Sequence, residues 1–243
     1  VMKTYFAESI GVAPEDIFTV SVMPCVAKKG ESNMELFYKE YAGHDTDIVL
    51  TTRELTRMIR SAHIDPKTLV DRECDPLMKE YSGAGVIFGA TGGVMEAALR
   101  SAHYLVTGRN PEPDAFKIVR SPAFGTGVIE AEVKLGDATV RAAVVSGLGN
   151  TRKLIEAIEH GEVHYDFVEV MACPGGCVGG GGQPIHDGEE LAHERGKNLY
   201  FLDEHSKIRF SHENPDVLKL YEDYMEKPCS HKAHMLLHTD HNA

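Results

Sequence analysis

Residues 175–182 contain six glycines, and this loop constrains the fold more than any other part of the chain. It follows an alternating, β-type segment from His164 to Ala172, and Cys173 and Cys177 flank its first two glycines. Glycine reaches positive φ without strain and lets the backbone approach a ligand closely. Because so many glycines are costly in conformational entropy to order, we expect a bound group to hold the loop in place.

Two thiols on one tight loop fit an iron–sulfur cluster. Backbone N–H groups in such a loop can point at an anionic object, and Cys173 and Cys177 can both reach one cluster. Two alternatives are open from these residues alone. One is a glycine-rich turn that buries two thiols without a ligand. The other is a zinc site, although zinc is often held by paired cysteines and the sequence contains no second such pair.

A second motif, Met23-Pro24-Cys25, ends another β-type segment that begins at Asp16. Lys28 follows the cysteine by three residues, so a turn or helix would place both side chains on one face. A cationic donor lowers the cost of burying thiolates or other negative ligands. Taken alone, Lys28 fits an ordinary surface lysine as well.

Charge and cysteine content narrow the class of protein. The chain has 37 acidic and 25 basic residues among 243, a net charge of −12, which argues against nucleic acid or an anionic membrane as the main partner. Apolar runs fall far short of 18 residues, so no membrane span is predicted. Five cysteines without a signal peptide favour a reducing, cytoplasmic location. The start at Val1 suggests a piece of a longer polypeptide.

Strand-like and helical segments alternate, which predicts an α/β fold. We expect two lobes of mixed or parallel sheet flanked by helices, with a boundary in the Pro- and Gly-rich region 110–127. Cys25 and Cys173 each follow the end of a predicted strand, the edge at which open α/β sheets bind ligands. Helices are predicted near 53–62, 94–105, 151–160 with Asn150 as cap, 189–205 and 216–224. A hairpin is predicted at 130–134 and 138–146, its second arm central in a sheet.

Combined, the motifs MPCxxKxxE and ExMACPGGCxxGGGQP, about 140 residues apart, resemble the iron-only ([FeFe]) hydrogenase family. The segment from Tyr81 to Ala98 and the ending from Ser230 to His238 resemble it too. The resemblance implies reversible reduction of protons to dihydrogen. It also implies an H-cluster in the cleft between the lobes: a [4Fe–4S] cluster joined to a di-iron subcluster with CO and cyanide ligands. Electrons would come from a ferredoxin-type carrier.

The resemblance also assigns roles to individual residues. Cys25 and Cys173 match ligands of the [4Fe–4S] cluster, and Cys177 matches the thiolate that bridges it to the di-iron subcluster. Lys28 matches the donor to a cyanide ligand. The remaining matches line the di-iron pocket: Met23, Pro24, Phe88, Gly89 and Met171. The implied domains are 1–115 with MPCxxK, 116–225 with CPGGC and GGGGQP, and a small-subunit-type tail, 226–243.

One departure from the family pattern concerns the ligand count. The family's TSCCP-type motif supplies the fourth cluster thiolate and a proton-relaying cysteine, and the sequence contains no Cys-Cys pair. Cys74 and Cys229 do not match those positions, and we read them as ordinary thiols. We therefore expect an upstream segment or a separate chain to supply the pair, and the isolated chain to be inactive.

Several alternatives stay open. The chain could be a non-catalytic relative, either a sensory hydrogenase homologue or an iron–sulfur assembly factor. Nucleotide binding at Gly92-Gly93 is disfavoured because the phosphate-loop spacing is missing. Four tail histidines have helical spacing and would share one helix face, either as a metal site or in a solvated tail: His231, His234, His238 and His241. Three glutamates, Glu31, Glu96 and Glu169, are candidate carboxylates near the cluster or on a proton path, and none is preferred.

Overall fold

The computed structural model of the chain describes residues 1–75, 78–121 and 127–239. These residues form two compact units, each made of discontinuous segments. The first unit contains Val1–Lys79, Gly181–Pro184 and Pro215–Ala243, and the second contains Glu80–Gly180 and Ile185–Asn214. The domains predicted from the sequence are a different division and stay predictions. No helix in the described part of the chain is long and apolar enough to cross a bilayer.

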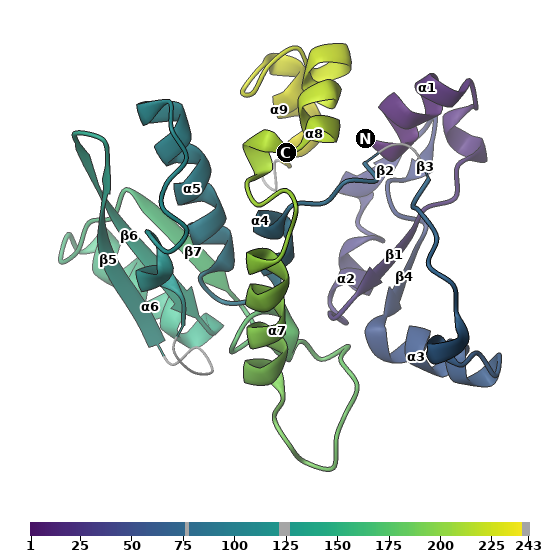
Figure 1. Cartoon of the computed structure of the whole chain (residues 1–243), viewed down its shortest axis with the longest axis horizontal. Helices are drawn as coiled ribbons and strands as arrows, with labels where there is room; N and C mark the ends of the chain where they lie inside the picture. The colour runs from purple at the N-terminus through teal and green to yellow at the C-terminus, as the bar shows by residue number, and fades with distance from the viewer. Residues whose placement is uncertain (76–77, 122–126, 240–243) are drawn as a thin grey trace. The chain divides into compact units, whose positions relative to one another are not determined.

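The second unit is built on a three-stranded sheet in the order β5–β6–β7 (Figure 1). β5 (Gly127–Leu135) and β6 (Ala138–Ser146) form the predicted hairpin, and β7 (Phe167–Met171) runs parallel to β6. β6 is central, and its second half, residues 142–146, is buried on both faces, which explains the apolar sequence there. Ala142 and Val144 pack with the helix α5 (Gly93–Thr107), and Ala143 and Val145 pack with α6 (Leu148–Glu159).

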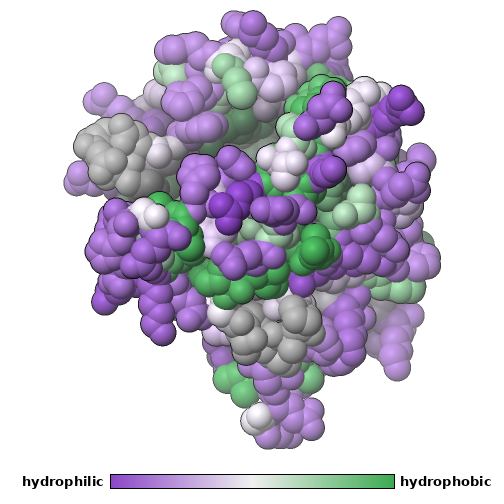
Figure 2. Space-filling model, turned by 90° about the vertical axis from the view of Figure 1, so that its left-hand side faces the viewer, coloured by the Kyte–Doolittle hydropathy of each residue, from purple (hydrophilic) through white to green (hydrophobic). Residues whose placement is uncertain are grey.

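The edge strand β5 alternates between buried and exposed residues. Ala131, Val133 and Leu135 face the core, whereas Glu130, Glu132 and Lys134 are exposed. Charged side chains on an edge strand discourage pairing with another chain. The face of the molecule on this side is correspondingly mostly hydrophilic, with some apolar groups near its middle (Figure 2).

A buried ionic network joins α5 to α7 (Ala192–Glu204) in the same unit. Arg100 donates to Glu96 at 2.7 Å and to both carboxylate oxygens of Asp203, while Arg120 donates to Glu96 and Arg209 to Asp203. Burial works to raise the pKa of Asp203, but the two guanidinium groups bring that pKa below its ordinary value. Because each buried charge has partners, the network avoids the penalty of an unpaired ion.

The first unit contains a parallel pair, β1 (Val20–Met23) and β4 (Ile48–Thr51), and a short hairpin, β2 (Tyr38–Lys39) and β3 (Gly43–His44). The remaining helices are α1 (Ala7–Ile10), which continues a π-helical turn at Met2–Phe6, α2 (Lys28–Glu31), α3 (Thr52–Ser61), α8 (Pro215–Leu220) and α9 (His231–Leu237). A further helix, α4 (Gly83–Val86), belongs to the second unit. The predicted α/β fold class is therefore confirmed.

Two local predictions are wrong. Asn150 does not cap α6, because the helix begins three residues before the predicted start, after Gly147 at φ +87°, and the Asn150 side chain donates to the carbonyl of Ser146 instead. The tail histidines do not share one helix face, because α9 ends at Leu237 and His238 has extended backbone. The rings of His234 and His238 nevertheless lie close together, with their centroids 4.5 Å apart. His241 lies outside the described residues.

Candidate metal centre

The loop that carries Cys173 and Cys177 is a tight glycine turn at the carboxyl end of β7. Gly175 and Gly176 have φ values of +81° and +96°, which other residues rarely adopt. The N–H of Gly176 donates to the carbonyl of Cys173 at 3.0 Å, and Cys177 begins a 3₁₀ turn. Cys173 thus follows the end of a parallel strand by two residues, as the sequence predicted.

This loop packs directly against the segment that contains Phe88 and Gly89. The N–H of Thr91 donates to the carbonyl of Gly175 at 3.2 Å. A Cβ on Gly176 would lie only 2.7 Å from the carbonyl oxygen of Gly89, so no side chain fits there. The second unit therefore brings Phe88 and Gly89 together with the cysteine loop, across more than 80 residues of sequence.

Glu169 on β7 forms hydrogen bonds that connect this strand to the backbone following Gly89. Its carboxylate is 5 % exposed and accepts hydrogen bonds from the N–H groups of Gly92 and Met95, both at 2.7 Å. These N–H groups belong to the first turn of α5 and its cap, where a negative charge is favourable. Burial nonetheless raises the pKa of Glu169, against the effect of the hydrogen bonds. The glutamate joins the strand that ends at Met171 to the turn after Gly89.

In the first unit, Met23 ends β1, and Pro24 and Cys25 form the turn that leads into α2. The parallel strand β4 ends beside it at Thr51, in register with Met23. Cys25, like Cys173, therefore lies at the carboxyl end of a parallel pair of strands. Cys25 and Cys173 belong to different units, so their convergence on one cluster stays a prediction.

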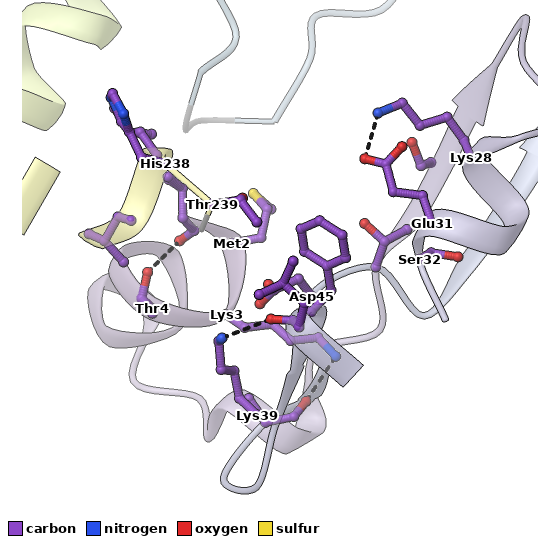
Figure 3. A pocket seen from close by; sticks show the side chains of 18 of the residues that line it. Met2, Lys3, Thr4, Lys28, Glu31, Ser32, Lys39, Asp45, His238 and Thr239 are labelled. Atoms are coloured by element: carbon purple, nitrogen blue, oxygen red, sulfur yellow. Dashed lines mark hydrogen bonds and ion pairs between the residues drawn. The ribbon is translucent and has the colours of Figure 1, made fainter. Parts of the chain in front are cut away.

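Lys28 lies on the wall of a cavity of about 500 Å³ in the first unit (Figure 3). Its ammonium group is paired with Glu31 at 2.8 Å, and its side chain is 45 % exposed. Met23 lines the same cavity, together with residues of the N-terminal turn and of the tail. The neighbouring Lys29 points elsewhere, toward the carbonyl of Val49 and the carboxylate of Glu54.

Gly181 and Gly182, at the end of the glycine run, belong to the first unit. The N–H of Gly182 donates to the carbonyl of Pro24 at 3.0 Å. A Cβ on Gly182 would lie 3.0 Å from the nitrogen of Cys25. The run that begins beyond Cys177 therefore ends directly against the turn that carries Cys25.

The five cysteines differ in how exposed they are. All five cysteines lie in the described ranges and none forms a disulfide. Cys25 and Cys173 are half-buried and Cys177 is exposed, and Gly176 and Gly182 let backbone come close to both loops. Among the described residues, no three side chains of His, Cys, Asp or Glu form a group that could hold one metal ion. Cys74 and Cys229 are exposed.

Sequence reasoning missed one residue at this site, Arg53. Its backbone N–H donates to the carbonyl of Gly182, and its guanidinium donates to the carbonyl of Gly181. The neighbouring capping box of Thr51 and Glu54 carries a recognisable sequence signature, Thr-x-x-Glu before an apolar pattern. Arg53 has no such signature, because its partners lie 128 residues away in the chain.

Comparison with known families places the chain. Residues 1–181 match the model of the iron-only hydrogenase large subunit, C-terminal domain, and residues 189–243 match the iron hydrogenase small subunit. The chain is 45 % identical over 240 residues to the NADP-reducing hydrogenase subunit HndD of Solidesulfovibrio fructosivorans. It is also 45 % identical, over 241 residues, to iron hydrogenase 1 of Clostridium pasteurianum. These alignments cover 98 % and 97 % of the chain but only 40 % and 41 % of the relatives, so the chain spans less than half their length.

A second group of relatives has a different named role. Cytosolic iron-sulfur assembly component 3 of Rattus norvegicus is 32 % identical over 250 residues, covering 100 % of the chain and 51 % of that protein. Among solved structures, apo [FeFe]-hydrogenase HydA1 from Chlamydomonas reinhardtii aligns with a TM-score of 0.80 at 39 % identity, covering 98 % of the chain and 66 % of that structure. The two family matches, in chain order and together nearly full length, show that this chain belongs to the iron-only hydrogenase family.

Proposed function

We propose that this chain forms the larger part of an H-cluster site that carries out 2H⁺ + 2e⁻ ⇌ H₂, the reaction of a hydrogenase-type oxidoreductase. The observation that carries the proposal is the placement of Cys25 and Cys173, each just beyond the end of a parallel strand. Gly176 and Gly182 pack closely against the backbone of Gly89 and of Pro24, which fixes the loops that carry the two cysteines. The family membership of the whole chain supports the same site.

In this proposal, Cys25 and Cys173 would hold the [4Fe–4S] cluster, and Cys177 would be the thiolate shared with the di-iron subcluster. The bound cluster supplies the redox chemistry, and the protein binds it, excludes water and tunes it. Met23, Pro24, Phe88, Gly89 and Met171 line the di-iron side. Lys28 would donate to a cyanide ligand, and such a charge-assisted hydrogen bond would be stronger in a dry site than in water.

The partners follow from the ligand count. Three thiolates of this chain would leave one position of a [4Fe–4S] cluster to another ligand. The family pattern assigns that position to a Cys-Cys pair, which a further segment or a separate chain would supply. A ferredoxin-type carrier supplies the electrons. The cytoplasmic location predicted from the cysteines stays a prediction, since one relative that is 46 % identical over 193 residues is named as a periplasmic large subunit.

The runner-up function is that of an iron–sulfur assembly factor, which the relatives named as assembly components favour. The two functions differ at Lys28. A site that only carries a [4Fe–4S] cluster has no need of a donor to cyanide, so the di-iron subcluster is the property to test.

The test reconstitutes the chain anaerobically with ferrous iron, sulfide and an external thiol, then adds a synthetic di-iron complex with CO and cyanide ligands. We expect the [4Fe–4S] signal by electron paramagnetic resonance, and infrared CO and CN bands that shift on binding. Lys28→Ala should lose the shifted bands and keep the [4Fe–4S] signal, whereas Lys29→Ala, the matched control, should keep both.

Two results would overturn this assignment. A wild-type chain that forms the [4Fe–4S] cluster but never shifts the infrared bands would support the assembly factor. A triple serine variant at Cys25, Cys173 and Cys177 that takes up as much iron and sulfide as wild type would remove the cluster site altogether.

A further inference from the structure

The end of the glycine run is held in place by three hydrogen bonds within the first unit. Arg53 makes two of them: its N–H donates to the carbonyl of Gly182 at 2.9 Å, and its Nη2 donates to the carbonyl of Gly181 at 2.7 Å. The third runs from the N–H of Gly182 to the carbonyl of Pro24. We name these three contacts the glycine clasp.

The start of α3 explains why Arg53 is available for this contact. The first N–H groups of a helix have no partner within the helix. Thr51 caps α3 and accepts the N–H of Glu54, and the Glu54 carboxylate accepts the N–H of Thr51. The N–H of Arg53 lies between them and is left for an outside acceptor, which is Gly182. The capping box also brings the pKa of Glu54 down to about 2, so it stays charged.

The clasp has no room for any residue but glycine at position 182. A Cβ there would lie 2.9 Å from the carbonyl carbon of Pro24 and 3.0 Å from the Cβ of Thr51. Both neighbours belong to strand ends, Pro24 after β1 and Thr51 at the end of β4, so neither can move away freely. The tight fit at Gly182 and the guanidinium contact to Gly181 therefore fix two adjacent residues.

We propose that Arg53 is a positioning residue for Cys177, acting through Gly181 and Gly182. Cys177 precedes Gly182 by five residues, which span at most about 18 Å when fully extended. An unanchored glycine run samples many conformations, and the clasp removes that freedom at one end, beside Cys25. The role in cluster binding rests on the proposed function, whereas the clasp itself does not.

The experiment compares the whole 243-residue chain with two variants of Arg53. Arg53→Met keeps a good helix former of similar length without the donor, and Arg53→Lys keeps a charged donor. Arg60→Met is the matched control, because Arg60 is exposed on the same helix. Circular dichroism verifies that each variant is folded.

The first readout is hydrogen exchange of the cluster-free chain at the amide of Gly182. We expect exchange to be about tenfold faster in Arg53→Met, since a charge-assisted hydrogen bond is lost. It should be close to wild type in Arg60→Met and intermediate in Arg53→Lys. Unchanged exchange in Arg53→Met would overturn the clasp, whether or not the chain binds a cluster.

The second readout is the loss of iron to a chelator after reconstitution with ferrous iron, sulfide and an external thiol. We expect iron to be lost about tenfold faster from Arg53→Met than from wild type. The rate should be intermediate for Arg53→Lys and equal to wild type for Arg60→Met. Faster exchange with unchanged iron loss would overturn the positioning role and leave the proposed function standing. A wild-type chain that takes up no cluster would overturn the proposed function, and the positioning role with it, while exchange still reports the clasp.

Discussion

At the scale of single residues, we expect the half-buried His212 to make the stability of the second unit depend on pH. Its ring stacks on the ring of Tyr104 with a centroid separation of 4.2 Å, and its centroid lies 5.4 Å from that of the Phe210 ring. Its two nitrogens contact the hydroxyl of Ser101 at 3.1 Å and the side-chain oxygen of Asn110 at 2.8 Å. Burial lowers the pKa of His212 below its ordinary value of 6.5, with Glu213 acting weakly in the other direction.

The sign of the effect follows from the direction of this shift. The unfolded chain takes up a proton at His212 near its ordinary pKa, whereas the folded chain does so only at lower pH. The contribution of His212 to the free energy of unfolding is therefore fully present above about pH 7. It falls as the pH drops through 6.5 toward the lowered pKa. We expect urea midpoints between pH 7.5 and 5 to fall more steeply for wild type than for His212→Gln. Parallel curves for the two proteins would contradict the prediction.

At the scale of secondary structure elements, the start of α5 depends on two glycines. Gly92 has a φ of +89°, and a Cβ on Gly93 would lie 1.8 Å from the carbonyl oxygen of Ile87. The backbone turn before α5 thus passes too close for any side chain. Because of this close approach, α5 begins where the carboxylate of Glu169 can accept hydrogen bonds from the N–H groups at the start of the helix.

A pair of glycine-to-alanine variants tests this point. Gly93→Ala should destabilise the second unit by about 3 kcal/mol or more, because the backbone itself must move. Gly149→Ala, near the start of α6, should stabilise by about 0.5 kcal/mol, because its Cβ meets nothing within 4 Å and its φ is not positive. Chemical denaturation measures both. Equal effects of the two substitutions would show that the close approach at Gly93 is not needed.

At the scale of the whole molecule, the number of thiolates limits what this chain does alone. In the proposed site, Cys25, Cys173 and Cys177 would supply three ligands, and a [4Fe–4S] cluster held by three protein thiolates would be open at one iron. Because metal binding contributes folding free energy, we expect a weakly held cluster to add less stability to the glycine loop than a fully ligated one.

We expect the isolated chain to evolve no hydrogen after anaerobic reconstitution with a di-iron complex, as measured by gas chromatography. A segment with a Cys-Cys pair, fused or added as a separate chain, should restore turnover. Serine at Cys74 or Cys229 should change neither iron uptake nor turnover. Hydrogen evolution by the isolated chain would contradict the essential role given to the second cysteine pair.

The sequence by itself determined the features that depend on neighbours in the chain. Two β-type segments separated by Gly136 and Asp137 predicted the β5–β6 hairpin, and the apolar second segment predicted that β6 is central. The strand ends that carry Cys25 and Cys173 were predicted in the same way. Periodicity carries this information because side-chain direction repeats along a strand or helix.

Only the tertiary structure decided which distant segments meet. Asn150 has the chemistry of a cap, but Gly147 at positive φ starts α6 earlier. Nothing near Glu169 indicates that it accepts hydrogen bonds from α5, 74 residues or more away. Arg53 likewise lies far in sequence from Gly181. Such contacts depend on where the backbone brings unpaired N–H and C=O groups together in space, and local patterning carries no record of that.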